Sequence, residues 1–212
     1  MNIVSVITAR GNSKGIPLKN IIDIKNKPLI FYAINASLKS NADETWVSTD
    51  NQEIKNISLS YGSRVLDRPQ ELADDSIMPD ESLMHFTEHV EFNWLVFIQP
   101  TSPMIKAEYI NEGIEMMKTG DYDSVFTVTK EHWMPRWSEN VEPIDWDIGN
   151  RPRRQDRSST YVENGMFYIT TKEQLSKTRL RYGGRIGFVE IPLFNSFQID
   201  NIEDLNLVRA LL

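Results

Sequence analysis

Residues 2–15, NIVSVITARGNSKG, decide the fold of this chain. The first part, NIVSVITA, is a short and continuous apolar run rich in β-branched residues, which is typical of a fully buried strand. The run stops at a loop that holds two glycines and the cations Arg10 and Lys14. A strand that is buried on both faces and leads into such a loop predicts the first strand of a mostly parallel α/β sheet.

Outward from this strand, apolar runs and helical patterns alternate along the chain. Strands are expected at residues 45–50, 64–69, 94–103, 121–129, 160–170 and 185–193, and helices at 28–40, 51–62, 80–90 and 201–212. This alternation predicts a right-handed, three-layer α/β sheet. A chain of 212 residues is long enough for one sizeable core, so we expect a single domain over residues 1–212.

Composition excludes several classes of protein. The formal net charge of -7 argues against a nucleic-acid partner, because such proteins need a dense cationic face. There is no cysteine and the three histidines are scattered, which excludes disulfides and argues against a zinc site. The sequence shows neither a signal peptide nor a run of about 18 apolar residues. We therefore expect a soluble, cytoplasmic protein without a membrane partner.

The predicted strand ends should share one crevice. Ligands of parallel α/β sheets bind beyond the carboxyl ends of the strands, where ARGNSKG, STD and QPTSP lie in this sequence. A loop with glycines and cations at that place is suited to cradle phosphates. It matches neither the Walker A pattern nor the dinucleotide fingerprint. A solvated basic turn is the alternative reading of the same residues.

Acidic and basic residues follow the next two strands. Asp50 could hold a metal or a sugar, but it directly precedes a helical pattern, so we expect it to cap that helix. Arg68 should lie near the crevice and could reach a triphosphate. Asp74 and Asp75, close by, read equally well as a solvated turn.

Polar groups also follow the strand at 94–103. Gln99, Thr101 and Ser102 supply a carboxamide and two hydroxyls, which suit the neutral groups of a base or sugar, although a proline-defined turn explains the same residues. Further on, alternation along YVENGMFYI places Glu163 and Gly165 on one face and Asn164 on the other. Gly165 would let a ligand or another backbone come near.

Residues 130–160 break the α/β pattern. They hold three of the five tryptophans and few helical signals, and they are too apolar for a linker. A segment of this kind is either functional or covered by something else. We expect a β-rich dimerisation and substrate arm that packs on a second subunit. Its arginine cluster, RPRRQD at 151–156, suits a carboxylate or phosphate, or an interface salt network.

With these pieces in order, the chain resembles the acylneuraminate cytidylyltransferases, also called CMP-sialic acid synthetases. The resemblance rests on ARGNSKGIPLKN, VSTD, RPQELADD, QPTSP, RWSE, NRPRRQD, ENGMFYI and IDNIEDL, which occur in the family's order and spacing. It implies a Rossmann-like nucleotidyltransferase fold and a homodimer that exchanges its arms. It also implies transfer of CMP from CTP to the anomeric hydroxyl of a nine-carbon 2-keto sugar acid, with release of pyrophosphate.

The resemblance also implies roles for individual residues. Arg10 and Lys14 would lie along the triphosphate as catalytic residues. The nucleotide side would comprise Arg10, Gly11, Asn12, Ser13, Lys14, Lys19, Asn20 and Arg68. The sugar side would comprise Gln99, Thr101, Ser102, Arg136, Arg154, Asn164 and Tyr168. Arg136 and Arg154 would come from the neighbouring subunit and face the sugar's carboxylate, and Asp200 would carry Mg²⁺ or Mn²⁺.

Two departures from the family pattern bear on these implications. The family usually closes with Asp-Ile-Asp, and Gln198 replaces the first aspartate here. Where relatives carry several Ser or Thr residues near the base, this chain has Ile77, Met78 and Pro79. Two alternatives therefore stay open: a nucleotidyltransferase that uses another base or acceptor sugar, and a non-catalytic relative that binds a nucleotide or a sugar acid.

Overall fold

The computed structural model describes residues 1–74, 76–132 and 134–212, so that Asp75, of the turn discussed above, and Trp133, of the predicted arm, lie outside the described residues. The strands are β1 (Ile3–Thr8), β2 (Asp23–Ile24), β3 (Lys27–Pro28), β4 (Glu44–Thr49), β5 (Arg64–Asp67), β6 (Trp94–Ile98), β7 (Ser124–Lys130), β8 (Arg136–Trp137), β9 (Pro143–Ile144), β10 (Tyr161–Thr171) and β11 (Ile186–Glu190). The α-helices are α1 (Leu29–Leu38), α2 (Gln52–Ser60), α3 (Pro79–His89), α4 (Ala107–Lys118), α5 (Lys172–Thr178) and α6 (Ile202–Leu211). The 3-10 helices are η1 (Lys19–Ile21), η2 (Gln70–Ala73), η3 (Arg154–Asp156) and η4 (Leu193–Asn195).

The central sheet has seven strands in the order β11-β7-β10-β6-β1-β4-β5. The pairs β1–β4, β1–β6, β4–β5 and β7–β11 are parallel, whereas β10 runs antiparallel to both β6 and β7. The predicted mostly parallel sheet is therefore confirmed. Long β10 is the exception, and it lies next to β6, the strand that leads into Gln99.

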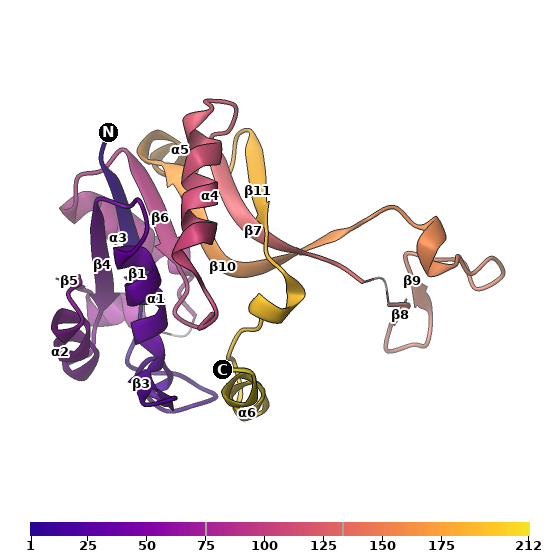
Figure 1. Cartoon of the computed structure of the whole chain (residues 1–212), viewed down its shortest axis with the longest axis horizontal. Helices are drawn as coiled ribbons and strands as arrows, with labels where there is room; N and C mark the ends of the chain where they lie inside the picture. Colours follow the sequence, from indigo (N-terminus) through magenta and orange to yellow (C-terminus); the bar gives the residue numbers. More distant parts are fainter. Residues whose placement is uncertain (75, 133) are drawn as a thin grey trace.

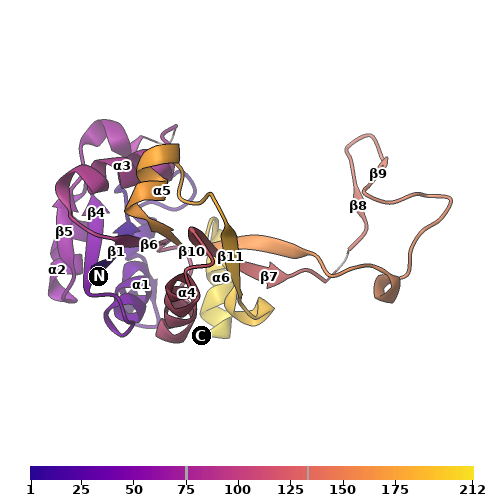
Figure 2. The same cartoon turned by 90° about the horizontal axis from the view of Figure 1, so that it is seen from above.

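Helices cover both faces of the sheet and give three layers (Figures 1 and 2). Side chains of β1 alternate between the layers: Ile3 and Ile7 pack with α1 and α4, whereas Val4 and Val6 pack with α3 and α5. These four side chains are at most 5% exposed. The apolar run at the start of the sequence is thus the centre of the core, as its composition predicts.

Two helices were not expected from the sequence. Helix α4 follows the proline-rich turn after β6 and buries Ile110, Gly113, Ile114 and Met117 along one face. Helix α5 has only seven residues and begins at the cap Thr171. None of the helices in the described ranges combines the length and apolar content needed to cross a bilayer.

The last helix packs under the loop that follows β1. Asn201 caps α6 in a capping box with Asp204, at the start of the helix predicted over residues 201–212. Leu205 and Val208 of α6 join a separate apolar cluster that includes Ile16 of the loop. This packing holds residues 198–200 beside the loop.

Between β7 and β10 the chain leaves the sheet as the segment 131–160, which projects from the globule in both views (Figures 1 and 2). We call this segment the arm. Its strands are the two-residue pair β8 and β9, and Trp137 and Trp146 pack edge to face with ring centroids 4.9 Å apart. The arm begins and ends at one place, where the Glu131 N–H donates to the Thr160 carbonyl at 2.8 Å.

Candidate active site

A cleft of about 520 Å³ opens at the carboxyl ends of β1 and β6, which carry Thr8 and lead into Gln99. We call it the nucleotide cleft, after the ligand that the sequence predicts for its residues. It is lined by Thr8, Arg10, Ser13, Lys14, Gly15, Lys19, Asn20, Arg68, Leu72, Asp74, Ile77, Met78, Pro79, Ser82, Phe97, Gln99, Pro100, Thr101, Gln198 and Asp200. The expectation that the ends of β1 and β6 share one crevice is therefore confirmed, whereas residues 48–50, the STD stretch expected there as well, are not among the residues that line it.

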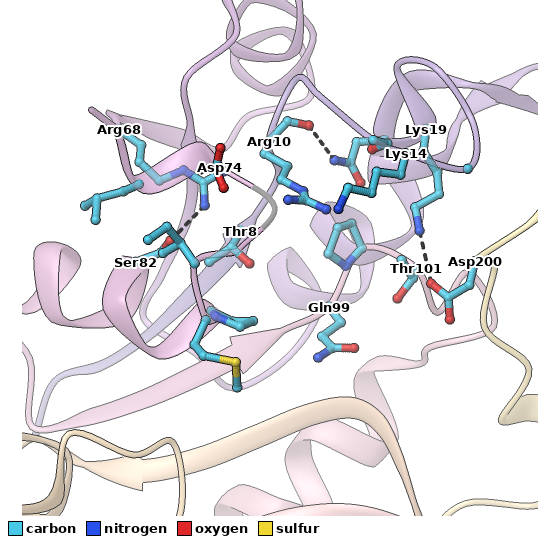
Figure 3. Close-up of a pocket in the computed structure, with 18 of the residues that line it drawn as sticks. Thr8, Arg10, Lys14, Lys19, Arg68, Asp74, Ser82, Gln99, Thr101 and Asp200 are labelled. Carbon is cyan, nitrogen blue, oxygen red and sulfur yellow. Dashed lines mark hydrogen bonds and ion pairs between the residues drawn. The ribbon is translucent and has the colours of Figure 1, made fainter. Parts of the chain in front are cut away.

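Cations converge on one side of the nucleotide cleft. Arg10, Lys14 and Lys19 point into it from the loop after β1 (Figure 3). The Asn20 amide donates to the Arg10 carbonyl at 2.9 Å and ties the two ends of the loop together. Three positive charges on one short loop make this wall suited to a polyphosphate.

Hydrogen bonds hold the loop after β1 against residues 199–200, which precede α6. The Lys19 ammonium donates to the Ile199 carbonyl at 2.9 Å and to Asp200 Oδ1 at 3.1 Å. The backbone of Gly15 approaches so closely that a Cβ atom there would lie 2.7 Å from the Asp200 carbonyl oxygen. A glycine is required at this position because any side chain would push the two segments apart.

The opposite wall is formed by a buried arginine. The side chain of Arg68 is 4% exposed, its Nη1 donates to Ser82 Oγ at 2.9 Å, and its Nη2 lies 3.8 Å from Asp50 Oδ1. Arg68 Nε and Nη2 have no hydrogen-bond partner among the described residues. Burial lowers the pKa of this guanidinium, and the Asp50 carboxylate opposes that effect. Arg68 thus contributes a fixed positive charge to this wall of the cleft.

Two acids of this region have roles that the sequence did not reveal. The prediction that Asp50 caps α2 is wrong, because Asn51 accepts the Glu53 and Ile54 N–H groups while Asp50 Oδ1 accepts from the Gly11 N–H at 3.0 Å. The pKa of Asp74 lies below its ordinary value. The hydroxyl and backbone N–H of Ser76 donate to its carboxylate, with smaller contributions from the charges of Lys14 and Arg10.

A second cavity of about 690 Å³ adjoins the nucleotide cleft. We call it the acceptor pocket, after the sugar that the sequence predicts for Gln99, Asn164 and Tyr168. It is lined by Gln99, Thr129, Lys130, Glu131, His132, Met134, Val162, Glu163, Asn164, Gly165, Tyr168, Leu193, Ser196, Phe197, Gln198, Asp200 and Asp204. Gln99, Gln198 and Asp200 line both cavities, so a reacting pair of ligands can meet at these residues.

A bulge in β10 shapes the acceptor pocket. The register between β10 and β7 shifts between Glu163 and Tyr168, and Gly165 has a φ of +67°. The Tyr168 hydroxyl consequently donates to Glu163 Oε1 on one face, which strict alternation would not allow. Burial, together with this hydrogen bond and the charge of Glu163, raises the pKa of Tyr168, so the hydroxyl is a neutral donor.

The side chain of Asn164 is directed at β7. Its Oδ1 accepts from Thr127 Oγ1 at 2.6 Å and its Nδ2 donates to Thr129 Oγ1 at 2.9 Å. The Asn164 carbonyl accepts from the Gln198 amide. The bulge is therefore held from both sides.

The structure gathers most of the sequence-predicted residues. Arg10, Ser13, Lys14, Lys19, Asn20, Arg68, Gln99, Thr101 and Asp200 line the nucleotide cleft, and Gln99, Asn164, Tyr168 and Asp200 line the acceptor pocket. Gly11 and Asn12 line a shallower hollow on the loop, and Ser102 is buried below the turn. Arg136 and Arg154 lie on the arm, where they contact Glu131 and His132 of the pocket wall.

Sequence reasoning missed several lining residues. Ser82 lies within α3 and has no motif around it, so only its hydrogen bond to Arg68 reveals it. Glu163 was placed by alternation alone, which the bulge interrupts. Ile77, Met78 and Pro79, noted as departures from the family pattern, do line the nucleotide cleft.

The residues present fit a cation that arrives with a triphosphate rather than a resident one. Asp200 is 67% exposed at the border of both cavities, and Mg²⁺ is commonly held by one or two carboxylates together with substrate phosphates. Within the described ranges, no group of three or more His, Cys, Asp or Glu residues forms a protein cage for a metal.

Comparisons with known proteins agree with this geometry. The sequence profile described as Cytidylyltransferase matches residues 4–190. N-acylneuraminate cytidylyltransferase A of Danio rerio is 38% identical over 208 residues, 94% of this chain and 48% of that protein. Pseudaminic acid cytidylyltransferase of Campylobacter jejuni is 27% identical over 100% of this chain and 96% of that protein.

The fold is shared with solved structures as well. A CMP:2-keto-3-deoxy-manno-octonic acid synthetase complexed with CTP superimposes with a TM-score of 0.77 at 19% identity, over 100% of this chain and 98% of that chain. The chain spans about half the length of the first N-acylneuraminate cytidylyltransferases it matches. Because the family profile covers most of its sequence, the chain belongs to the cytidylyltransferase family.

Proposed function

We propose that this chain transfers CMP from CTP to the anomeric hydroxyl of a sialic-acid-like, nine-carbon 2-keto sugar acid and releases pyrophosphate. One observation carries the proposal: a cation-lined nucleotide cleft and an acceptor pocket share Gln99, Gln198 and Asp200. Family membership and the named relatives support the same reaction.

The reaction requires little covalent chemistry from the protein. The anomeric oxygen forms a bond to the α-phosphorus, the bond to the bridging oxygen of pyrophosphate breaks, and the hydroxyl proton is released to solvent. Catalysis then depends on in-line alignment and on neutralisation of negative charge. In this proposal Arg10 and Lys14 neutralise the phosphates, while Lys19 neutralises charge and keeps Asp200 in place.

The acceptor side provides neutral groups. Gln99 and the Tyr168 hydroxyl, with the Asn164 bulge between them, would orient the sugar's hydroxyl groups. Arg136 and Arg154 would face its carboxylate from the arm of a second copy. Their place on a projecting segment and the exposed Met134, Val141 and Ile148 of that arm support a homodimer with exchanged arms.

Asp200 would hold Mg²⁺ or Mn²⁺ that arrives with the triphosphate, and the cation would supply further neutralisation of phosphate charge. A cytoplasmic location and a single domain over residues 1–212 stay predictions from the sequence. The base of the nucleotide would lie at the end of the cleft that is lined by the apolar Met78 and Pro79 and by Arg68.

Pyrophosphate release tests the proposal. Protein and Mg²⁺ are assayed with each of the four nucleoside triphosphates against a panel of nine- and eight-carbon 2-keto sugar acids. Release with CTP and a nine-carbon acid is expected. Release with another triphosphate or only with eight-carbon acids would correct the base or the acceptor, and calorimetric binding of CTP without any release would favour a binding role instead.

A further inference from the structure

We propose that Gln198 is a positioning residue: its amide fixes the β10 bulge that forms the wall of the acceptor pocket, and it does not act as a cation ligand. The identity of that pocket's ligand rests on the proposed function. The contacts that place Gln198 do not.

The backbone around Gln198 is anchored on two sides. The Ile199 N–H donates to the Thr101 carbonyl at 2.9 Å, and the Ile199 carbonyl accepts from the Lys19 ammonium at 2.9 Å. The Ile199 side chain is fully buried. Because these contacts leave the neighbouring backbone little freedom, the Gln198 side chain is directed at the border between the two cavities.

Oxygen acceptors surround the Gln198 amide nitrogen. Nε2 donates to the Asn164 carbonyl, and Gln99 Oε1 and Ser102 Oγ each lie 3.4 Å away. Gly165 is so close that a Cβ atom there would lie 2.7 Å from Nε2. A carbonyl oxygen and an amide oxygen cannot donate, so the residue at position 198 has to supply the hydrogens.

This donor completes the support of the bulge. The side chain of Asn164 is held by Thr127 and Thr129 of β7, and its main-chain carbonyl is held by Gln198. The bulge in turn sets the face on which Tyr168 meets Glu163. A carboxylate at position 198 would face two oxygen acceptors, so an amide is the group that satisfies this position without a cation.

Hydrogen exchange without any ligand tests the positioning role. The backbone amides of Met166 and Phe167 donate to Asn164 Oδ1 and Thr127 Oγ1, so their exchange reports on the bulge. Gln198→Met keeps the length of the side chain and removes the donor. We expect about fivefold faster exchange of these amides, the effect of losing one hydrogen bond.

Gln52→Met is the matched control. The Gln52 amide donates to Asn56 within α2, away from both cavities, and its loss should leave the exchange of Met166 and Phe167 unchanged. Unchanged exchange in Gln198→Met would overturn the proposal. This readout needs neither nucleotide nor sugar, so it stands or fails separately from the pyrophosphate assay.

Kinetics separate positioning from metal binding. Gln198→Met should raise the KM of the sugar acid about fivefold and leave the Mg²⁺ concentration for half-maximal rate unchanged. Gln198→Glu should raise the sugar KM more, because a carboxylate at this position cannot donate to the Asn164 carbonyl. A raised Mg²⁺ requirement with an unchanged sugar KM would show that Gln198 ligates the cation.

Discussion

Arg181 binds the carboxylate of Asp80 through both its backbone N–H and its side chain. The backbone N–H donates to Asp80 Oδ1 at 2.7 Å and Nε lies 3.2 Å from Oδ2, while the two side chains are 12% and 8% exposed. The same guanidinium lies over the rings of Phe97 and Tyr168, 5.6 and 5.2 Å from their centroids. Phe97 lines the nucleotide cleft and Tyr168 lines the acceptor pocket, so this buried ion pair packs against one ring of each cavity.

Removal of one partner of this pair should destabilise the fold. Arg181→Met leaves Asp80 buried without its cation, and we expect a loss of about 3 kcal/mol in the free energy of unfolding. The double variant Asp80→Asn, Arg181→Met should lose less than the sum of the single variants, measured by urea denaturation. Additive losses would mean that the ion pair contributes nothing specific. Arg185→Met, which opens the exposed pair with Asp123, is the control and should hardly move the unfolding midpoint.

Gly165→Ala should affect the acceptor pocket more than stability. A Cβ atom would lie 2.7 Å from Gln198 Nε2 and 3.0 Å from Gln99 Oε1, and both are ends of side chains that can move aside. Gly120→Ala is a matched control, because Gly120 also has a positive φ, +77°, and nothing lies within 4 Å of its Cβ position. Both variants should lose a similar 1 to 2 kcal/mol, an order-of-magnitude figure for a left-handed residue, in thermal denaturation.

Only Gly165→Ala should raise the KM of the sugar acid, because only there are Gln99 and Gln198 displaced. An equal sugar KM in the two variants would contradict the geometry of the shared wall.

Arg154→Ala should weaken the binding of the sugar acid far more than the binding of CTP. Loss of a charge-assisted contact to a carboxylate predicts at least a roughly tenfold rise in the sugar KM. Arg153→Ala is the neighbouring control, because Arg153 already pairs with Asp156 at 2.7 Å. Steady-state kinetics with each substrate varied in turn measures both effects. Equal rises for CTP and sugar would rule against a carboxylate role.

Arm exchange makes a separate prediction. At a sugar concentration well below its KM, the Arg154→Ala and Lys14→Ala variants should each release pyrophosphate slowly, but a mixed dimer would contain one site with neither change. Co-expression of the two variants should therefore restore pyrophosphate release. Failure of a purified mixed dimer to regain activity would place Arg154 at the site of its own chain.

The free energy of unfolding should decrease as the pH is lowered, because His85 takes up a proton more readily in the unfolded chain. Burial lowers the pKa of this imidazole, His89 and Arg68 lower it further, and Glu88 and Glu71 oppose the shift. Its Nδ1 is buried without a partner among the described residues. The unfolded chain binds the proton near pH 6.5 and the folded chain only at lower pH, so stability present above that pH is lost below it.

Urea denaturation between pH 7.5 and 5 checks this prediction. His85→Asn should show a smaller fall in the free energy of unfolding than the unaltered chain. The same slope in the two proteins would show that His85 does not titrate differently on folding.

The sequence sufficed for features that depend on local pattern. Apolar runs predicted the strands, and the shared edge of parallel strands predicted that Arg10 and Gln99 would line one cleft. Helix α4 was not predicted because it follows a proline-rich turn and its N-cap, Lys106, makes no side-chain capping hydrogen bond. Its apolar spacing at Ile110, Ile114 and Met117 was the signal that remained.

The rest of the candidate site depends on packing between distant segments. Alternation cannot reveal a bulge, so the meeting of Tyr168 with Glu163 had no signature in the sequence. The contact between Arg68 and Ser82 likewise depends on how α3 lies against the end of β5. Contacts such as these join residues that are distant in the sequence, so they become visible only in the folded structure.

The place where the arm leaves the sheet determines which changes in sequence length the fold can accept. Lys130 and Tyr161 are direct partners in the β7–β10 ladder, so the chain leaves the sheet and re-enters it at adjacent points. Residues 131–160 are thus an insertion with a single point of attachment. A loop from a relative, or a short hairpin turn, can be grafted between these two residues without shifting the register of any strand. The length of the segment can therefore change without disturbing the sheet, whereas Glu131 and His132 at its base are constrained by the acceptor pocket that they line.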